Sequence, residues 1–309
     1  MGSSRQGINL HSVHYTTGLF VEKLLESGRC ISEVENLCER MKTIMERTYL
    51  LRYDTEASNP RQDMTGFLER VLEVHRKYEI PVTLFCKGAA MEYREQEFVA
   101  FFHEMKDDSL FDIQDHSYSH VGVGYEAGKS VEVLKADYER SFAVHERLRG
   151  IRPIGVSRCG TSGADGKALS GFDATEKSRA EFEMLVDLGV RMIDTFYTGI
   201  RGSAEFINYG PIGHPEVCGF LSGHSDTAWL HRKEFGDPME HILSVIRKTA
   251  ERGHHLPLMM HDWVAWNHSK DKELSVIVEI VDCVRECGFE MRTHKQCYED
   301  VSLWQGQKR

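Results

Sequence analysis

Residues 50–56, LLRYDTE, decide how this chain is interpreted. An apolar run ends abruptly in two acids, Asp54 and Glu56, which are two positions apart. On an extended strand, residues i and i+2 point to the same side, so both carboxylates would project from the carboxyl end of one strand. Two acids that converge on a small volume repel each other unless a positive charge lies between them, and a metal ion commonly supplies it. Taken alone, a strand that ends in solvated acids explains the stretch more simply.

Beyond this first strand, apolar strands alternate with amphipathic helices about seven times. The spacing predicts helices near 63–79, 95–106, 129–149, 176–188, 239–252 and 272–287. It predicts strands near 82–86, 110–113, 151–156, 190–194, 217–221, 256–260 and 289–292, with Thr293 as the N-cap of a last helix. Such alternation predicts an α/β fold with a parallel sheet. A closed barrel and an open doubly wound sheet both fit the pattern.

The chain before the first strand has a different character. Apolar residues recur at helical spacing from about Thr17 to Arg47. We therefore predict an N-terminal helical extension over residues 1–47 and a single barrel domain over residues 48–309. The extension could serve as a lid, as a dimer contact or as a cap on the barrel, so a homo-oligomer is possible.

Composition restricts the class of partner. The net charge of −10 argues against nucleic acid or an anionic membrane surface as the main partner. No apolar run is long enough to span a membrane, and residues 1–7 lack the apolar core of a signal peptide. The eight cysteines are scattered without a CxxC pair, which is typical of reduced thiols in the cytoplasm. These features favour a cytoplasmic protein that acts on a small molecule.

A second cluster of metal-binding side chains follows a predicted strand. The segment 116–120, HSYSH, places His116 and His120 four residues apart. On a helical turn, two such imidazoles share one face and can bind one ion, although chance pairs are common among 16 histidines. Together with Asp54 and Glu56 they supply two imidazoles and a carboxylate, which leaves coordination positions open. One acid can then bind the metal while the other acts as a general base.

The order of five short motifs across residues 48–300 resembles that of the polysaccharide deacetylases, carbohydrate esterase family four. Segment 52–56, RYDTE, resembles the first motif, which implies Asp54 as catalytic base and Glu56 as a metal ligand. Segment 116–120 resembles the second motif, which implies that both of its histidines bind the metal.

The third motif of the family is only half present, as RCGT at residues 158–161. The resemblance implies that Arg158 pairs with Asp54 and that the backbone N–H of Thr161 contributes to an oxyanion hole. The proline and the aromatic residue of the family pattern are missing, so the wall on which a sugar would stack differs in this chain.

The remaining two motifs supply the predicted acid catalyst. Segment 225–229, SDTAW, resembles the fourth motif, and 258–261, LMMH, resembles the fifth. The resemblance implies that His261 protonates the leaving amine, kept cationic by an acid. Asp226 is our preferred partner for His261, with Asp194 and Asp262 as alternatives. Three tryptophans, Trp229, Trp263 and Trp266, could either pack in the core or form walls of the substrate site, and we assign Trp229 to the substrate site.

The resemblance implies a distorted (β/α) TIM-like barrel that holds one divalent metal ion, zinc first, with nickel, cobalt and manganese as alternatives. It implies a hydrolase of C–N amide bonds, most simply an N-deacetylase of a small N-acylated sugar or related metabolite in carbohydrate metabolism. One alternative is an imide- or allantoin-cleaving amidohydrolase of the same fold. Another is a non-catalytic binding protein that keeps the fold.

Overall fold

The structure is a computed structural model that describes residues 47–59, 61–121, 130–159, 176–197, 199–230, 232–268 and 272–305. The predicted N-terminal extension lies outside the described residues except for Arg47, and so does Thr161. The extension therefore stays a prediction.

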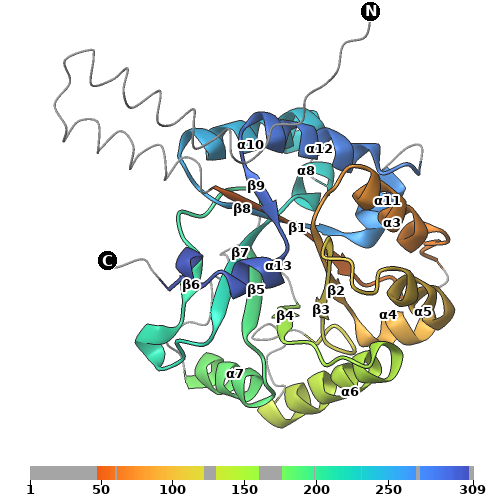
Figure 1. Ribbon diagram of the computed structural model, residues 1–309, viewed down its shortest axis with the longest axis vertical. Coiled ribbons are helices and arrows are strands. Elements are labelled where there is room, and N and C mark those ends of the chain that lie inside the picture. Colours follow the sequence, from red (N-terminus) through yellow and green to blue (C-terminus); the bar gives the residue numbers. More distant parts are fainter. Residues whose placement is uncertain are drawn as a thin grey trace, which may run out of the picture. The chain divides into compact units, whose positions relative to one another are not determined.

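Seven parallel strands close into a barrel at the centre of the described chain (Figure 1). They are β1 (Thr48–Thr55), β2 (Val82–Cys86), β3 (Phe111–Asp115), β4 (Gly155–Ser157), β5 (Met192–Tyr197), β7 (Cys218–His224) and β8 (Leu256–His261). Each pairs with the next, and β1 closes the ring by pairing with both β8 and β2. The predicted barrel of about seven strands is confirmed.

Two short strands lie at the margin of the barrel. Strand β6 (Ile207–Asn208) runs antiparallel to β7, and β9 (Glu290–Arg292) pairs with the amino-terminal half of β1. Because β2 pairs with the carboxyl-terminal half of β1, β2 and β9 share one side of that strand.

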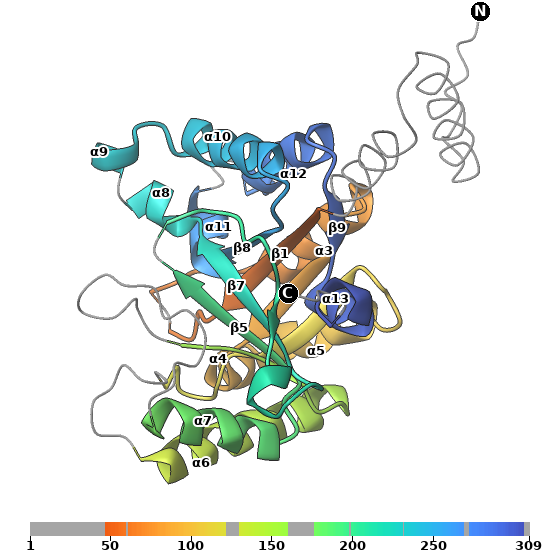
Figure 2. The same ribbon diagram turned by 90° about the vertical axis from the view of Figure 1, so that its left-hand side faces the viewer.

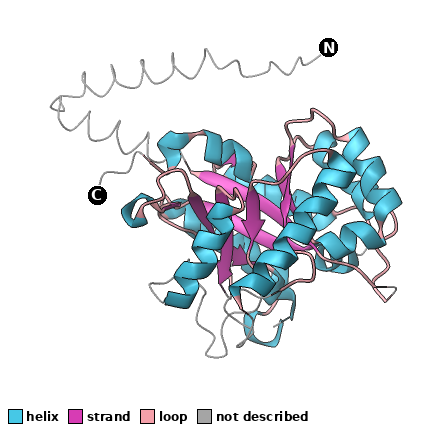
Figure 3. Ribbon diagram, turned by 90° about the horizontal axis from the view of Figure 1, so that it is seen from below, coloured by secondary structure: helices cyan, strands magenta, loops and turns pink. Residues whose placement is uncertain are grey.

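Helices form the outer layer around the strands (Figure 3). They are α3 (Phe67–Lys77), α4 (Gly88–Tyr93), α5 (Glu95–Glu104), α6 (Val131–Arg149), α7 (Glu176–Asp187), α8 (Asp226–Leu230), α9 (Arg232–Phe235), α10 (Pro238–Glu251), α11 (Asp262–His268), α12 (Ser275–Glu286) and α13 (His294–Glu299), with 3-10 turns η1 (Gly210–Ile212) and η2 (Val301–Leu303). Helices α6 and α7 cover one flank and α10 and α12 the opposite one (Figure 2). The sequence predicted the long helices but not the short α4, α8, α9 and α11.

The alternation of side chains along β1 separates two environments. Leu51 and Tyr53 are buried in the large apolar core beneath the helices. Leu50 points the other way and packs inside the barrel with residues such as Met192 and Phe220. Burying a large apolar side chain contributes about 1.5–3 kcal/mol, so the register of β1 is strongly specified.

Helix α13 closes the amino-terminal end of the barrel. Its first backbone N–H groups reach side chains near the starts of β2 and β3: His294 donates to Thr83 Oγ1 at 3.0 Å and Lys295 to Asp112 Oδ2 at 3.1 Å. Thr293 is the N-cap, as predicted, and forms a capping box with Gln296. At the opposite end, where the strands finish, a barrel presents its functional side chains.

The six cysteines that the structure describes are free thiols, five of them buried. Within the described ranges, none of the helices combines the length and the apolar character that crossing a membrane requires.

Candidate metal and catalytic site

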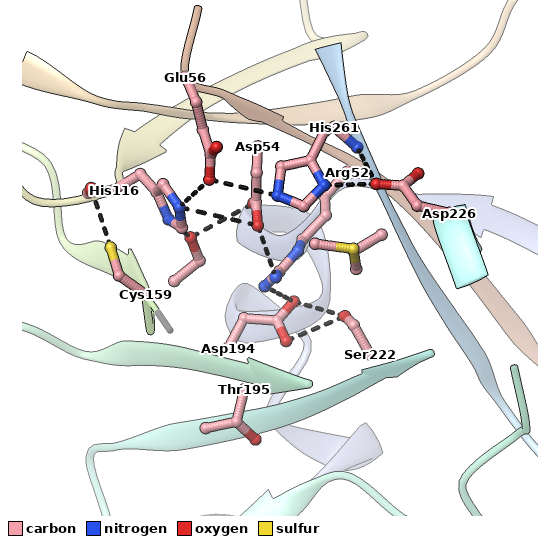
Figure 4. Close-up of polar contacts among 12 residues, drawn as sticks. Arg52, Asp54, Glu56, His116, Cys159, Asp194, Thr195, Ser222, Asp226 and His261 are labelled. Carbon is pink, nitrogen blue, oxygen red and sulfur yellow. Dashed lines mark hydrogen bonds and ion pairs between the residues drawn. The ribbon is translucent and has the colours of Figure 1, made fainter. Parts of the chain in front are cut away.

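Four of the predicted residues meet at one carboxylate oxygen at the carboxyl ends of the strands. Glu56 Oε1 lies 2.9 Å from His116 Nε2, 2.9 Å from His120 Nε2 and 3.3 Å from His261 Nε2. Figure 4 shows Glu56 reaching between the rings of His116 and His261. Three separate parts of the chain, the segments after β1 and β3 and the last residue of β8, thus bring their side chains to one point.

The loop after β3 brings the two histidines together without a helix, so the predicted helical turn at 116–120 is wrong. Ser117 and His120 adopt positive φ angles of 55° and 62°, which are rare for residues other than glycine. The loop is held by carboxylates: Asp115 accepts the N–H of Ser117 at 2.7 Å, and Asp137 on α6 accepts two further backbone N–H groups at 2.8 and 3.1 Å. Strained backbone held in this way commonly marks a functional site.

The hydrogen bonds around His116 indicate that a positive charge belongs between its ring and Glu56. Ser157 Oγ donates to Asp54 Oδ1 at 3.4 Å, so the His116 Nδ1–H donates to Ser157. A neutral His116 then has a bare lone pair on Nε2, and this atom faces a carboxylate oxygen of Glu56 at 2.9 Å. Two acceptors at that distance need a proton or a cation between them. Two imidazole nitrogens and a carboxylate suit a divalent cation such as zinc.

Three candidate acids could have supported His261, and the structure brings Asp226 to it. Asp226 is fully buried, and its Oδ2 accepts hydrogen bonds from His261 Nδ1–H and, at 3.2 Å, from the His261 backbone N–H. Asp262 instead accepts the backbone N–H of Glu56 at 3.3 Å, and burial raises its pKa to about 6. Asp194 lies deeper in the barrel.

The ionisation of the site follows from these contacts. Burial alone would lower the pKa of His261, but the carboxylates of Glu56 and Asp226 more than offset it and raise that pKa well above its ordinary value. Burial likewise would raise the pKa of Glu56, yet His261, His116 and His120 hold it well below the usual range. These contacts favour the cationic form of His261, with Nδ1–H bonded to Asp226.

The cation that the structure pairs with Asp54 is Arg52, which the sequence analysis did not name, and the pairing of Asp54 with Arg158 stays a prediction. Arg52 Nη2 lies 3.0 Å from Asp54 Oδ2, and Arg52 Nη1 lies 3.0 Å from Asp194 Oδ2 (Figure 4). Arg158, just after β4, is buried near the same site and donates its backbone N–H to the Asp194 carbonyl at 2.9 Å. Arg52 was missed although its spacing from Asp54 was a usable signal, because an arginine two residues before an inward-facing acid faces inward as well.

The tryptophans divide between site and core. Trp263 lies beside the site, with its ring centroid 5.5 Å from that of His261. Trp266 is buried and packs edge-on against Phe67 at 5.8 Å, so it belongs to the core. Trp229 is partly buried on α8, packs against the main core and lies 5.5 Å from the Arg232 guanidinium.

A scan against protein-family models and a search of curated proteins both find no match. Among solved structures, the chain is similar to a protein from Mycobacterium smegmatis provisionally described as a polysaccharide deacetylase, with 12% identity, a TM-score of 0.57 and coverage of 83% of this chain and 91% of that one. A polysaccharide deacetylase from Bacillus cereus is 13% identical with a TM-score of 0.47, and the match covers 80% of this chain and 92% of that one. A peptidoglycan deacetylase from Bacillus subtilis is 15% identical with a TM-score of 0.46, and the match covers 84% of this chain and 93% of that one. The mycobacterial likeness confirms the fold that the five motifs imply.

Proposed function

We propose that the protein is a metal-dependent hydrolase that cleaves the C–N amide bond of a small N-acylated substrate, with N-acetylated amino sugars as the first candidates. One observation supports this most. The Glu56 carboxylate meets the imidazoles of His116 and His120, while a separate acid, Asp54, and a separate imidazole–carboxylate pair lie beside them. A binding protein would have no use for an acid and a base on either side of a cation site.

Glu56, His116 and His120 would hold the cation, zinc by the softness of two imidazole ligands. A divalent cation bound there would act as a Lewis acid that polarises the acyl oxygen and makes water more acidic. The other residues then have roles that follow from their charges and contacts.

Asp54 is the proposed general base. It is buried, its Oδ2 lies 3.0 Å from Arg52, and its carboxylate lies 3.9 Å from His116 Nε2. It takes a proton from water as the water oxygen forms a bond to the acyl carbon. The backbone N–H of Thr161 is the proposed donor to the developing oxyanion.

His261 is the proposed general acid. Its Nε2–H points into the site while Asp226 holds Nδ1–H, so it can transfer a proton to the nitrogen as the C–N bond breaks. The water supplies the hydroxyl of the carboxylic acid product, and the amine leaves neutral. Trp263, beside His261, is the aromatic surface on which a sugar ring could stack, with Trp229 as a second candidate.

Metal analysis combined with a hydrolysis assay tests the proposal. The purified protein should contain about one equivalent of a divalent metal. On a panel of N-acylated sugars, cyclic imides and ureides, it should release acetate or formate from an N-acylated sugar, whereas the alternative amidohydrolase would open the ring of an imide or ureide. Asp54→Asn should keep the metal and lose at least about 100-fold in kcat, since general base catalysis contributes about that much. His116→Ala should lose metal and activity together.

His214→Ala is the matched control. His214 is a partly buried histidine that pairs with Glu183 at 2.9 Å, far from the site in sequence. This variant should keep metal and activity. Stoichiometric metal in His116→Ala would overturn the ligand assignment, and a metal-loaded protein that cleaves nothing on the panel would favour a binding role.

A further inference from the structure

A second group of candidate metal ligands lies beside the proposed catalytic site. One ligand atom from each of His224, Asp226 and His261 lies within 4.8 Å of the ligand atoms of the other two. His224 and His261 are the last residues of the neighbouring strands β7 and β8, and Asp226 begins α8. Two imidazoles and a carboxylate are the same kinds of ligand that form the first proposed metal site.

The backbone fixes the positions of these residues. The His224 N–H donates to the Gly199 carbonyl at 2.8 Å, and Ser225 donates its N–H and its hydroxyl to the Met259 carbonyl on β8 at 3.0 and 2.7 Å. The turn from β7 into α8 is thus tied to the strand that carries His261. The fold itself therefore brings the three side chains together before a cation binds.

Two polar atoms of this group are buried without a hydrogen-bond partner among the described residues. One is Oδ1 of Asp226, a fully buried residue whose Oδ2 accepts both hydrogen bonds from His261 (Figure 4). The other is Nδ1 of His224. A buried polar atom without a partner is energetically unfavourable, so a ligand that binds a carboxylate oxygen and an imidazole nitrogen together would stabilise both. A divalent cation is such a ligand.

The environment of the His224 ring suits a metal ligand. Burial lowers the pKa of His224, although the Asp226 carboxylate acts in the opposite direction. The ring is therefore neutral at neutral pH, and a neutral imidazole offers the lone pair of one nitrogen to a metal. Its ring centroid lies 5.4 Å from that of His261 and 5.5 Å from that of Phe196, whose side chain offers no hydrogen bond in competition.

The distances allow coordination after small movements. In a tetrahedral zinc site with bonds of about 2.0–2.1 Å, ligand atoms lie roughly 3.3 Å apart, so atoms within 4.8 Å of one another have to approach by about 1.5 Å at most. The cation also replaces the hydrogen that His261 Nδ1 donates to Asp226, and this hydrogen leaves to water as a proton. Because a proton competes with the cation, this group should bind zinc more weakly than Glu56, His116 and His120 do.

We propose that His224, Asp226 and His261 form a second, weaker site for a divalent cation such as zinc, and that a cation bound there inhibits hydrolysis. With the metal on Nδ1, His261 can give up its Nε2–H only by becoming an imidazolate, so it is a much weaker acid than the imidazolium. The leaving nitrogen then lacks its proton donor. The inhibition rests on the proposed function, whereas binding of the second cation does not.

Zinc titration of the full-length protein tests the second site. Competition with a chelating dye should show a second equivalent that binds the wild type more weakly than the first. In nitrogen-15 NMR of the histidine rings, the first equivalent should shift the signals of His116 and His120, and the second should shift those of His224 and His261. A second equivalent that leaves the His224 signals unchanged would contradict the assignment.

The variant His224→Gln separates the two sites. It should retain the first equivalent, which shows that the variant is folded, and it should bind the second at least about tenfold more weakly because one of three ligands is lost. Excess zinc should inhibit the wild type, and the variant should need at least about tenfold more zinc for the same fractional inhibition. Each activity is compared with that of the same protein at one equivalent of zinc.

His255→Gln is the matched control, because His255 is a buried histidine that accepts the Thr48 N–H at 3.1 Å and belongs to none of the groups of candidate metal ligands in the described chain. It should keep both equivalents and the inhibition by zinc. A wild type that binds only one equivalent at millimolar zinc, or a second equivalent that binds His224→Gln as tightly as the wild type, would overturn the second site. Equal inhibition of wild type and His224→Gln would overturn its effect on hydrolysis. A wild type that binds two equivalents as described but cleaves nothing would count against the proposed function and still support the second site.

Discussion

Three charged side chains alternate along β1 and the residue after it: a cation, Arg52, and two anions, Asp54 and Glu56. Their spacing of two residues means that one strand supplies a charged side chain to each successive level of the barrel interior. Each of these charges is costly to bury alone and is stabilised only by partners from other strands. Single substitutions here should therefore affect stability and chemistry together.

Arg52→Lys should destabilise the protein by about 2–4 kcal/mol, because one ammonium cannot contact both Asp54 and Asp194 as the guanidinium does, and removing a partner of a buried pair costs about that much. Urea unfolding measures the change. The control is Arg70→Lys, whose partly exposed arginine lies 2.8 Å from both Glu73 and Glu273. It should change the free energy of unfolding by less than about 0.5 kcal/mol. Equal losses for the two variants would contradict our account of the buried ion pairs.

At this scale the sequence predicted which motif residues would lie near one another, but not how all of them pair. Glu56 and His116 follow a strand and His261 ends one. The ends of parallel strands share one edge, so the meeting of these three residues followed from the pattern. The spacing of two residues could have identified Arg52 as the partner of Asp54, but the second partner of Arg52, Asp194 on β5, depends on how β1 and β5 are placed around the closed ring. Such long-range placement is not encoded in any local spacing.

Whether a helix or strand could be predicted from the sequence depended on its length. The long helices and the strands β2, β5 and β8 carry enough apolar periodicity to be found. The four unpredicted helices are short, and in one or two turns a helical period cannot be distinguished from chance. The loop at 116–120 shows the opposite error. A spacing of four suggested a helix, whereas hydrogen bonds to Asp115 and Asp137 hold an irregular loop.

The contact between α4 and this loop makes a prediction about metal affinity. A Cβ added at Gly88 would lie 2.8 Å from Ser141 Oγ and 2.8 Å from Tyr118 Cδ2, and the Gly88 N–H bonds the Ser117 carbonyl at 2.9 Å. Gly88→Ala should therefore displace the loop that carries His116. We expect about 1–3 kcal/mol of destabilisation and about tenfold weaker zinc binding, measured by competition with a chelating dye.

Gly150→Ala provides the comparison for Gly88→Ala. Gly150 ends α6 with a φ of 71°, and a Cβ there would meet nothing within 4 Å. The alanine is strained in that conformation, which costs about 1 kcal/mol or more, but the strain lies far from the loop. Zinc affinity should stay at the wild-type value. If Gly150→Ala weakened zinc binding as much as Gly88→Ala does, general destabilisation rather than loop displacement would explain both.

On the scale of the whole molecule, titratable groups are buried on both sides of the barrel wall. His75 lies between β1 and α3, where its Nδ1–H donates to the Ile80 carbonyl at 2.8 Å and its Nε2 accepts from the Tyr53 hydroxyl at 3.2 Å. His255 lies near the start of β1 and accepts the Thr48 N–H at 3.1 Å. The hydrogen bond to His255 requires a neutral ring, and burial favours a neutral ring at His75.

These two histidines should make the fold labile to mild acid. Burial lowers the pKa of His75 to about 4 and that of His255 to about 4, while the unfolded chain has the ordinary value of about 6.5. Between these values the unfolded state binds the protons and the folded state does not, so stability is complete above pH 6.5 and falls as the pH drops towards 4. Each histidine contributes a slope of at most about 1.4 kcal/mol per pH unit to the free energy of unfolding.

Urea unfolding at pH 7.5, 6.0 and 5.0 measures this slope, and His75→Gln should remove about half of it. His103→Gln, at a ring that is 84% exposed, should leave the slope unchanged. A wild type equally stable at pH 7.5 and 5.0 would show that these rings accept protons without unfolding.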